Sequence, residues 1–277
     1  MDYRKIVQDV IVEHKAAPVD MLGIGDGTGE YNYLNALRAS YVRTLRDIDR
    51  LYAGDRSSRR ILEIGSFLGA VSISLKKLGY DVSAVDIPEF HASDRLRALY
   101  ARHAIAYHGL NLKSSKLPFE PESQDVVIAC EVMEHLNFNP LPALQEISRV
   151  LKKDGHFYVA MPNQSNIVNR VKLLLGKSIH NPIDDYFKQL DRNDNMIVGL
   201  HWREYTLPET VELLERMGFT PVRKYYFTDT AYPPPNIFKS ALKGLACLFP
   251  PFRPSQVVIG RKVATPAHDF WLTDANS

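Results

Sequence analysis

The 277-residue chain is long enough to bury one sizeable core, and a composition of 45% hydrophobic and 24% charged residues is ordinary for a globular protein. Its net charge is +2 and it carries no long basic run, so no electrostatic sign of nucleic-acid binding is present. Two cysteines cannot form a disulfide framework, the N-terminus is too charged for a signal peptide, and no apolar run approaches the roughly 20 residues of a membrane span, which together predict a cytoplasmic protein.

Residues 1–59 are predicted to form an N-terminal helical extension. An amphipathic helix ends before Pro18, and the glycine-rich stretch 23–29 is expected to be a surface loop. That stretch lacks both the preceding strand and the Lys-Ser/Thr ending of a phosphate-binding loop. A single longer helix is expected over 33–52, where apolar residues form one stripe that can pack on a sheet.

The stretch 60–78, RILEIGSFLGAVSISLKKL, is predicted to be a strand, a tight turn and a helix. The apolar run 61–64 is typical of a buried parallel strand, and from Ala70 the apolar residues recur at helical spacing. A strand, a glycine-bearing turn and a helix form the first half of a nucleotide-type βαβ unit.

The turn itself distinguishes between ligand classes. Gly65 and Gly69 let a ligand approach the backbone without a side chain in the way. A dinucleotide fingerprint starting at Gly65 would need two more glycines, at the positions that Phe67 and Ala70 occupy. The spacing therefore argues against a pyrophosphate site.

The following residues continue the alternation of strands and helices. Asp86 ends the strand predicted over 81–86, 21 residues beyond Gly65, where a carboxylate can accept hydrogen bonds from both hydroxyls of a ribose. Further strands are expected over 105–108, 126–130, 157–161, 219–228 and 257–261, and further helices over 92–103, 141–151 and 206–218. This pattern predicts an α/β fold with a doubly wound, parallel, seven-stranded Rossmann-like sheet over 60–263.

Three segments depart from the alternation. Residues 163–200 are predicted to form a lid insertion, with an apolar helical stripe at 167–175 and an irregular polar and aromatic stretch at 181–186. The amphipathic segment 237–249 is expected to pack on the core rather than to contact a membrane surface. Residues 264–277 are expected to be a tail.

Several ordered motifs are similar to those of class I S-adenosylmethionine (SAM) dependent methyltransferases. They are the acidic residue before Gly-x-x-x-Gly, the run LPFEPESQDVVIACEVMEHL and the run RVLKKDGHFYVAMPN. The resemblance covers roughly 60–260 and, at a finer level, extends to bacterial methyltransferases associated with polysaccharide and natural-product gene sets. It implies SAM as the cofactor. The residues that it places at the SAM pocket are Glu63, Gly65, Ser66, Gly69, Asp86, Ile87, Asn111, Leu112, Cys130 and Glu131.

The chemistry of methyl transfer directs attention to two histidines. The methyl group of SAM is already activated, so the protein mainly has to position the acceptor and remove its proton. A hydroxyl acceptor needs a base or a metal, and histidine is the usual base near neutral pH. His135 and His201, together with Glu134, are the predicted catalytic residues of an O-methyltransferase acting on a small molecule, sugar or glycolipid.

A metal is the alternative means of activating the acceptor. Glu131, Glu134 and His135 stand at i, i+3 and i+4, on one face if a helix begins there. E-V-M-E-H resembles E-x-x-E-H in small-RNA 3′-end methyltransferases, where these residues and one later histidine bind a divalent ion, and the similar run in ubiquinone-biosynthesis O-methyltransferases. The resemblance implies Mg²⁺ or Mn²⁺, with His201 as the later ligand. Because Mg²⁺ prefers oxygen ligands, we predict proton-handling or acceptor-positioning histidines and no metal.

Two other functions use a similar sheet. One is an NAD(P)-dependent oxidoreductase, against which Phe67 and Ala70 weigh. The other is a catalytically silent SAM-binding module with a regulatory role. The motifs favour the methyltransferase over both.

Overall fold

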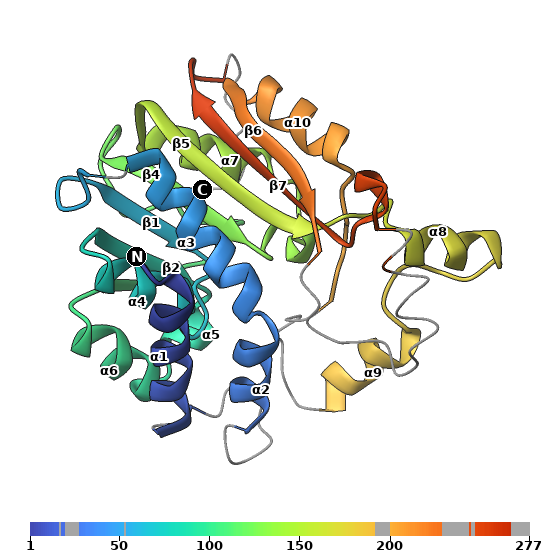
Figure 1. Cartoon of the computed structure of the whole chain (residues 1–277), viewed down its shortest axis with the longest axis horizontal. Helices are drawn as coiled ribbons and strands as arrows, with labels where there is room; N and C mark the ends of the chain where they lie inside the picture. The colour runs from blue at the N-terminus through green and yellow to red at the C-terminus, as the bar shows by residue number, and fades with distance from the viewer. Residues whose placement is uncertain are drawn as a thin grey trace, which may run out of the picture. The chain divides into compact units, whose positions relative to one another are not determined.

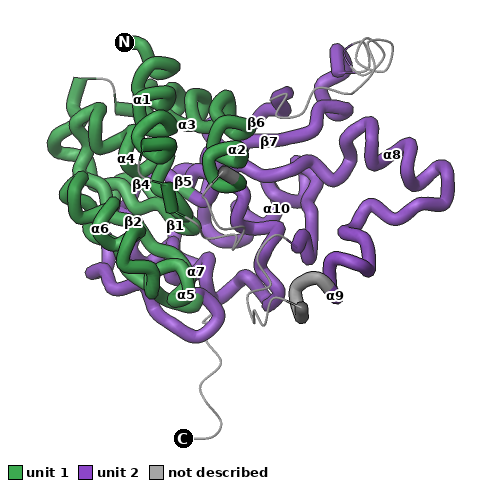
Figure 2. Tube along the Cα trace, turned by 90° about the horizontal axis from the view of Figure 1, so that it is seen from below, with its two compact units in different colours: residues 1–111, 124–128, 229–235 green, residues 112–123, 129–228, 236–277 purple. Residues whose placement is uncertain are grey.

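The computed structural model describes residues 1–16, 18–19, 28–52, 54–191, 200–228, 244 and 247–266. These residues divide into two compact units, coloured separately in Figure 2. The N-terminal unit contains the described residues of 1–111 and 124–128, and the C-terminal unit contains those of 112–123 and 129–266. The predicted loop 23–29, the amphipathic segment 237–249 and the tail 264–277 lie largely outside the described residues.

Seven strands form one mixed sheet in the order β3-β2-β1-β4-β5-β7-β6 (Figure 1). Their bounds are β1 Arg60–Ile64, β2 Asp81–Asp86, β3 Ala106–Gly109, β4 Gln124–Cys130, β5 Leu151–Pro162, β6 Phe219–Phe227 and β7 Ser255–Lys262. β1, β2 and β3 pair in parallel, and the apolar residues of β1 and β4 are buried on both faces. The predicted α/β fold with a seven-stranded Rossmann-like sheet is confirmed.

One strand runs against the predicted direction. β7 is antiparallel to both of its neighbours, so the expectation of a wholly parallel sheet is wrong at this side. Ser255, the first residue of β7, pairs with Pro162 and Phe227, the last residues of β5 and β6. The strand therefore enters the sheet at the edge where its neighbours end and has to run the other way.

The described helices are α1 Tyr3–Ala16, α2 Thr28–Ala36, α3 Arg38–Tyr52, α4 Ala70–Lys77, α5 Pro88–His91, α6 Asp94–Arg102, α7 Leu141–Val150, α8 Ile167–Leu174, α9 Ile183–Asp191 and α10 Leu207–Arg216, with short 3₁₀ turns at Met133–His135 and Pro250–Phe252. In the N-terminal unit, α1 packs on α3 and α4, and α4 packs on β2. In the C-terminal unit, α10 covers β6 and β7. No helix in the described ranges is long and apolar enough to cross a membrane.

The helices differ from the sequence prediction in three places. The stretch 181–186, predicted to be irregular, enters the helix α9 at Ile183. The single helix expected over 33–52 is two helices that meet at Leu37, although hydrogen bonds from Leu37 N to Tyr33 O and from Tyr41 N to Leu37 O, both 3.1 Å, continue across the break. α5 was not predicted, because four residues are too few to show a helical period. Thr206 and Glu209 form a capping box at the start of α10.

Two buried carboxylates hold the N-terminal unit together. Asp125 of β4 accepts hydrogen bonds from Arg59 Nη1 and from the Arg60 amide, both at 3.0 Å. Asp49 of α3 receives Arg56 Nε at 2.5 Å, the Tyr3 hydroxyl at 2.7 Å and the Tyr80 hydroxyl at 2.9 Å. The N-terminal helices and the first strands therefore share one core. The Arg56 guanidinium holds the pKa of Asp49 down at about 2.

Asp49→Asn should lower the free energy of unfolding at pH 7 by about 1.5–3 kcal/mol, the usual contribution of hydrogen bonds to a charged group. Because folding lowers the pKa of Asp49, its ionised form stabilises the protein above the unfolded pKa of about 4, and this stabilisation is lost as the pH falls towards 2. Urea denaturation of both proteins at pH 7 and pH 3 should therefore show a smaller difference at pH 3. Equal stability at pH 7 would contradict the assignment.

Candidate active site

The turn between β1 and α4 contains two glycines with positive φ. Gly65 and Gly69 have φ values of +67° and +71°, in the left-handed region that favours glycine. Gly69 is buried, and a Cβ there would lie 3.1 Å from Ile73 and 3.2 Å from Tyr100. Phe67, between the two glycines, has a φ of +43° and is therefore strained. A side chain at Gly69 would disturb this packing, and one at Gly65 would strain the backbone.

Glu63 lies beneath this turn. The residue is 4% exposed, and the Ser72 hydroxyl of α4 donates a hydrogen bond to its carboxylate. Burial raises the pKa of Glu63 to about 8. In this position the carboxyl group joins the end of β1 to the helix that follows it.

Two further side chains hold the turn, and sequence reasoning missed both. His14 of α1 is buried and its Nε2 donates to the Leu68 carbonyl at 2.6 Å. The Tyr100 hydroxyl of α6 lies 2.8 Å from Ser66 Oγ. His14 precedes Leu68 by 54 residues and Tyr100 follows Ser66 by 34, so no local pattern could have indicated these contacts.

Asp86 connects the end of β2 to the same turn. Its carboxylate accepts hydrogen bonds from the Phe67 amide at 2.5 Å and from the Ile87 amide at 2.8 Å. The residue is 7% exposed, and burial raises its pKa to about 6. Each oxygen keeps a further lone pair that could accept a ligand hydroxyl.

The structure places the predicted cofactor residues in two groups. One group lies at or just after the carboxyl ends of β1, β2 and β3 in the N-terminal unit and consists of Gly65, Ser66, Gly69, Asp86, Ile87 and Asn111. Glu63 is in the last part of β1. Leu112 is in the C-terminal unit, as are Cys130 and Glu131 at the end of β4. Ligands of open α/β sheets bind at the carboxyl ends of the strands.

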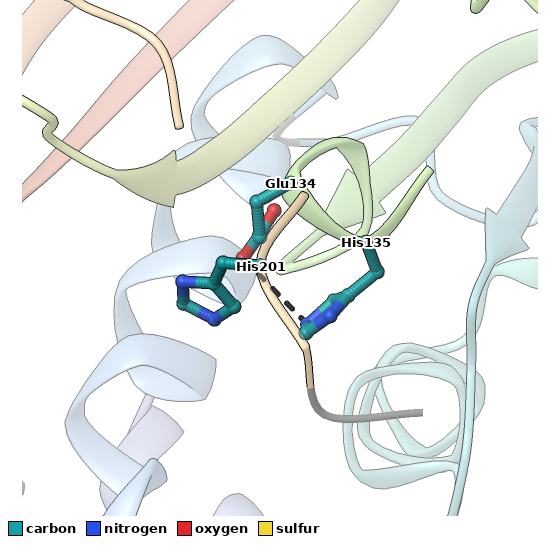
Figure 3. A group of neighbouring side chains, drawn as sticks. All are labelled: Glu134, His135 and His201. Carbon is teal, nitrogen blue, oxygen red and sulfur yellow. Dashed lines mark ion pairs between the residues drawn. The ribbon is translucent and has the colours of Figure 1, made fainter. Parts of the chain in front are cut away.

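A second cluster lies within the C-terminal unit, where Glu134, His135 and His201 come together (Figure 3). Glu134 and His135 belong to the short turn after β4, and His201 precedes α10. The Glu134 carbonyl accepts hydrogen bonds from the amides of Trp202 at 2.7 Å and Arg203 at 3.3 Å, which joins the two segments. The imidazole rings of His135 and His201 are 4.9 Å apart and nearly perpendicular.

The expected helical face does not form. Glu131 has a φ of +54°, and the residues after it make a single 3₁₀ turn rather than an α-helix. Glu131 is therefore outside the group whose candidate ligand atoms all lie within 4.8 Å of one another. Its charge still adds to the effect of burial in raising the pKa of Glu134 well above the usual range.

Glu134 is buried, whereas His135 beside it is half-buried. The Glu134 side chain is fully buried, and neither of its oxygens has a hydrogen-bond partner among the described residues. His135 Nε2 lies 4.0 Å from Glu134 Oε1, the contact dashed in Figure 3. Burial lowers the pKa of His135 to about 4, so its ring is neutral at physiological pH.

The hydrogen bonds fix which ring nitrogen is free. His135 Nδ1 lies 2.9 Å from the Leu200 carbonyl, and His201 Nδ1 lies 2.9 Å from Glu204 Oε1. Both oxygens accept, so Nδ1 carries the proton in each ring and the Nε2 of a neutral ring presents a lone pair. Glu204 Oε2 accepts in turn from Asn169 Nδ2 of α8 at 3.1 Å.

Glu204 and Asn169 were not predicted from the sequence. Glu204 follows His201 by three residues in the run HWRE, and this short spacing is the one signal that could have indicated it. Asn169 lies inside an apolar helical stripe and carries no such signal. Its role depends on the tertiary contact alone.

Comparison with known proteins decides the family. Residues 62–159 match the family described as a methyltransferase domain. The chain is 26% identical over 214 residues to the ubiquinone biosynthesis O-methyltransferase of Photobacterium profundum. The alignment covers 68% of this chain and 86% of that protein. The chain therefore carries a SAM-dependent methyltransferase domain of class I over residues 62–159.

Solved methyltransferases share the fold. A SAM-dependent methyltransferase from Thermotoga maritima aligns with a TM-score of 0.52 and 17% identity, over 85% of this chain and 96% of that one. Phosphoethanolamine N-methyltransferase 2 from Haemonchus contortus aligns with a TM-score of 0.56 and 15% identity, over 88% of this chain and 60% of that one. The methyltransferase family implies SAM as cofactor and a small-molecule acceptor, so the oxidoreductase and silent-module alternatives are set aside.

The turn after β1 fits SAM in one respect, since the buried Asp86 carboxylate at the end of β2 keeps a free lone pair on each oxygen. Asp86→Ala should remove one or two hydrogen bonds to the ribose, each about 1.5–3 kcal/mol, and weaken SAM binding at least about tenfold. Calorimetry measures the dissociation constant. Asp81→Ala, at the exposed start of the same strand, is the matched control and should bind normally.

The same carboxyl group predicts a pH dependence. Because the pKa of Asp86 is raised to about 6, protonation below that pH removes the charged acceptor, and SAM affinity should fall between pH 7 and pH 5. Asp86→Asn should bind weakly at both values. Affinity that is independent of pH in the unsubstituted protein would show that this carboxylate does not bind the cofactor.

Proposed function

We propose that this methyltransferase transfers a methyl group to a hydroxyl of a small molecule, sugar or glycolipid, with His135 and His201 handling the acceptor. The observation that carries the proposal is the pair of imidazoles whose Nδ1–H groups are engaged, leaving Nε2 available beside the buried Glu134. An oxygen acceptor is supported by the similarity to a ubiquinone biosynthesis O-methyltransferase, which is 26% identical to this chain and is named for transfer to oxygen.

Cofactor binding is assigned to the residues after the strand ends. The proposed set is Gly65, Ser66, Gly69, Asp86, Ile87, Asn111, Leu112, Cys130 and Glu131, with Glu63 holding the turn from beneath. When bound, SAM supplies a methyl group that is already activated for displacement. The chain's own tasks are then to hold the acceptor and to take its proton.

His135 and His201 differ in what they can contribute. Burial lowers the pKa of His135 to about 4, so this ring is a weak base that suits hydrogen bonding and orientation of the acceptor. His201 has the Glu204 carboxylate on its Nδ1–H, which would stabilise the imidazolium formed when Nε2 takes a proton. We therefore assign proton removal to His201 and acceptor positioning to His135.

His201→Ala should lower kcat/KM by about 10²–10⁴-fold, the usual contribution of a general base, while the dissociation constant of SAM stays unchanged. Glu204→Gln should lower it less, because the imidazole remains. His180→Ala, at an exposed histidine of the same unit, is the control and should be fully active. An acceptor for these assays can be found by screening extracts for a SAM-dependent gain of one methylene. Full activity in both His135→Ala and His201→Ala would reject the assignment.

A metal at this cluster is the second candidate, favoured by three possible ligand atoms within 4.8 Å of one another and by the buried Glu134, whose oxygens have no hydrogen-bond partner among the described residues. One carboxylate and two imidazoles are ligands that suit Zn²⁺, Mn²⁺ or Fe²⁺ better than the Mg²⁺ named from the sequence. An acceptor hydroxyl held on such an ion would lose its proton more readily. The two candidates give opposite results on chelation.

We expect the chelated methyltransferase to keep its full activity, because proton removal by His201 needs no metal. The measurement compares turnover before chelation, after dialysis against a chelator, and after Mn²⁺ or Zn²⁺ is restored, with SAM binding as a check of the fold. Activity that is lost on chelation, returns with Mn²⁺ or Zn²⁺ and is absent from Glu134→Gln would show that a metal, and not His201, activates the acceptor.

The setting of the reaction is also a proposal. Cys130 is half-buried and Cys247 is buried, and neither forms a disulfide. Cysteines that are not oxidised to a disulfide suit a reducing cytoplasm.

A further inference from the structure

α8 carries a face of large apolar side chains that no described residue of its unit covers. Asn169 is the buried residue of this helix. The exposed fractions are 46% for Val168, 46% for Val171, 59% for Leu173, 86% for Leu174 and 66% for Leu175. The helix extends away from the strands of the C-terminal unit in Figures 1 and 2. The apolar stripe predicted at 167–175 therefore forms a helix but faces outward.

A second apolar segment lies beside α8. Leu248 is 72% exposed and Phe249 is 57% exposed. The Phe249 ring contacts Phe252 at 4.9 Å between centroids, and the Arg170 guanidinium of α8 lies 5.2 Å from the centre of the Phe252 ring. We call Val168, Val171, Leu173, Leu174, Leu175, Leu248 and Phe249 together the α8 surface.

The charges carried by the α8 segment itself have one sign. Residues 167–177, IVNRVKLLLGK, contain Arg170, Lys172 and Lys177 and no acidic residue. A short amphipathic helix with exposed leucines and only basic charges is typical of helices that lie in the interface of an anionic bilayer. A two-fold contact between copies of this chain would instead bring these like charges together.

We propose that the α8 surface docks onto an anionic lipid bilayer. The leucines enter the boundary between headgroups and acyl chains, and Arg170, Lys172 and Lys177 lie among the lipid phosphates. Docking is independent of the reaction that the protein catalyses.

The docking helix is connected to the histidine cluster. Asn169, on the covered side of α8, donates to Glu204, and the other oxygen of Glu204 bonds His201. Two hydrogen bonds therefore join the membrane-facing helix to the proposed base. If the acceptor is a glycolipid, a point that rests on the proposed function, the enzyme would meet it on this same surface.

Co-sedimentation of the full chain with lipid vesicles tests docking directly. Binding is expected to vesicles that contain phosphatidylglycerol and to be weaker on phosphatidylcholine alone. Leu174→Asp combined with Leu175→Asp should reduce binding at least about tenfold, because both side chains are removed from the apolar layer. Lys172→Glu combined with Lys177→Glu should weaken binding to the anionic vesicles in particular.

Val12→Asp is the matched control, since Val12 is 49% exposed on another helix, α1, and the variant should bind vesicles normally. Circular dichroism and SAM affinity should be unchanged in every variant, which separates docking from folding and from the proposed function. Absence of binding by the unsubstituted protein, or equal binding by the leucine variant, would overturn the proposal. A dimer in sedimentation velocity that the leucine substitutions abolish, without vesicle binding, would assign the surface to a second copy instead.

Discussion

The conformation of the turn after β1 depends on the hydrogen bond from the Phe67 amide to the buried carboxylate of Asp86. Phe67 stands in the left-handed region, where a bulky residue is strained and has to be held by its surroundings. Asp86 holds it, and the end of β2 is thereby joined to the turn after β1. The same carboxylate is the proposed partner of the cofactor ribose, so the shape of the turn and the recognition of SAM rest on one group.

Much of the fold could be predicted from the sequence, because its signals are local. Buried parallel strands are continuous apolar runs, and Gly65, Gly69 and Asp86 are recognised by type and spacing. The direction of β7 could not be predicted, since it depends on which sheet edge the strand enters. Neither could the pairing of His201 with Glu204, because a hydrogen bond depends on how the two side chains are oriented.

The apolar stripe of α8 shows the limit of periodicity in another way. Helical spacing predicts that one face is apolar, and that face exists, but spacing alone cannot say what covers it. Burial of Glu134 is the opposite case. A carboxylate after a strand gives no sequence sign that it will be enclosed without a hydrogen-bond partner in the part of the chain that the structure describes. Such a group costs free energy to bury and is found where function requires it.

The role of Asp125 has a consequence for biosynthesis. The N-terminal unit is discontinuous, because its core includes residues 124–128 of β4 and the Arg59 and Arg60 contacts of Asp125. At about 5–20 residues per second, the ribosome takes several seconds to proceed from β1 to β4. Until then β1 can pair only with β2, and its other edge is open to non-native pairing. A nascent chain that has not yet reached β4 should therefore be a client for ribosome-associated chaperones.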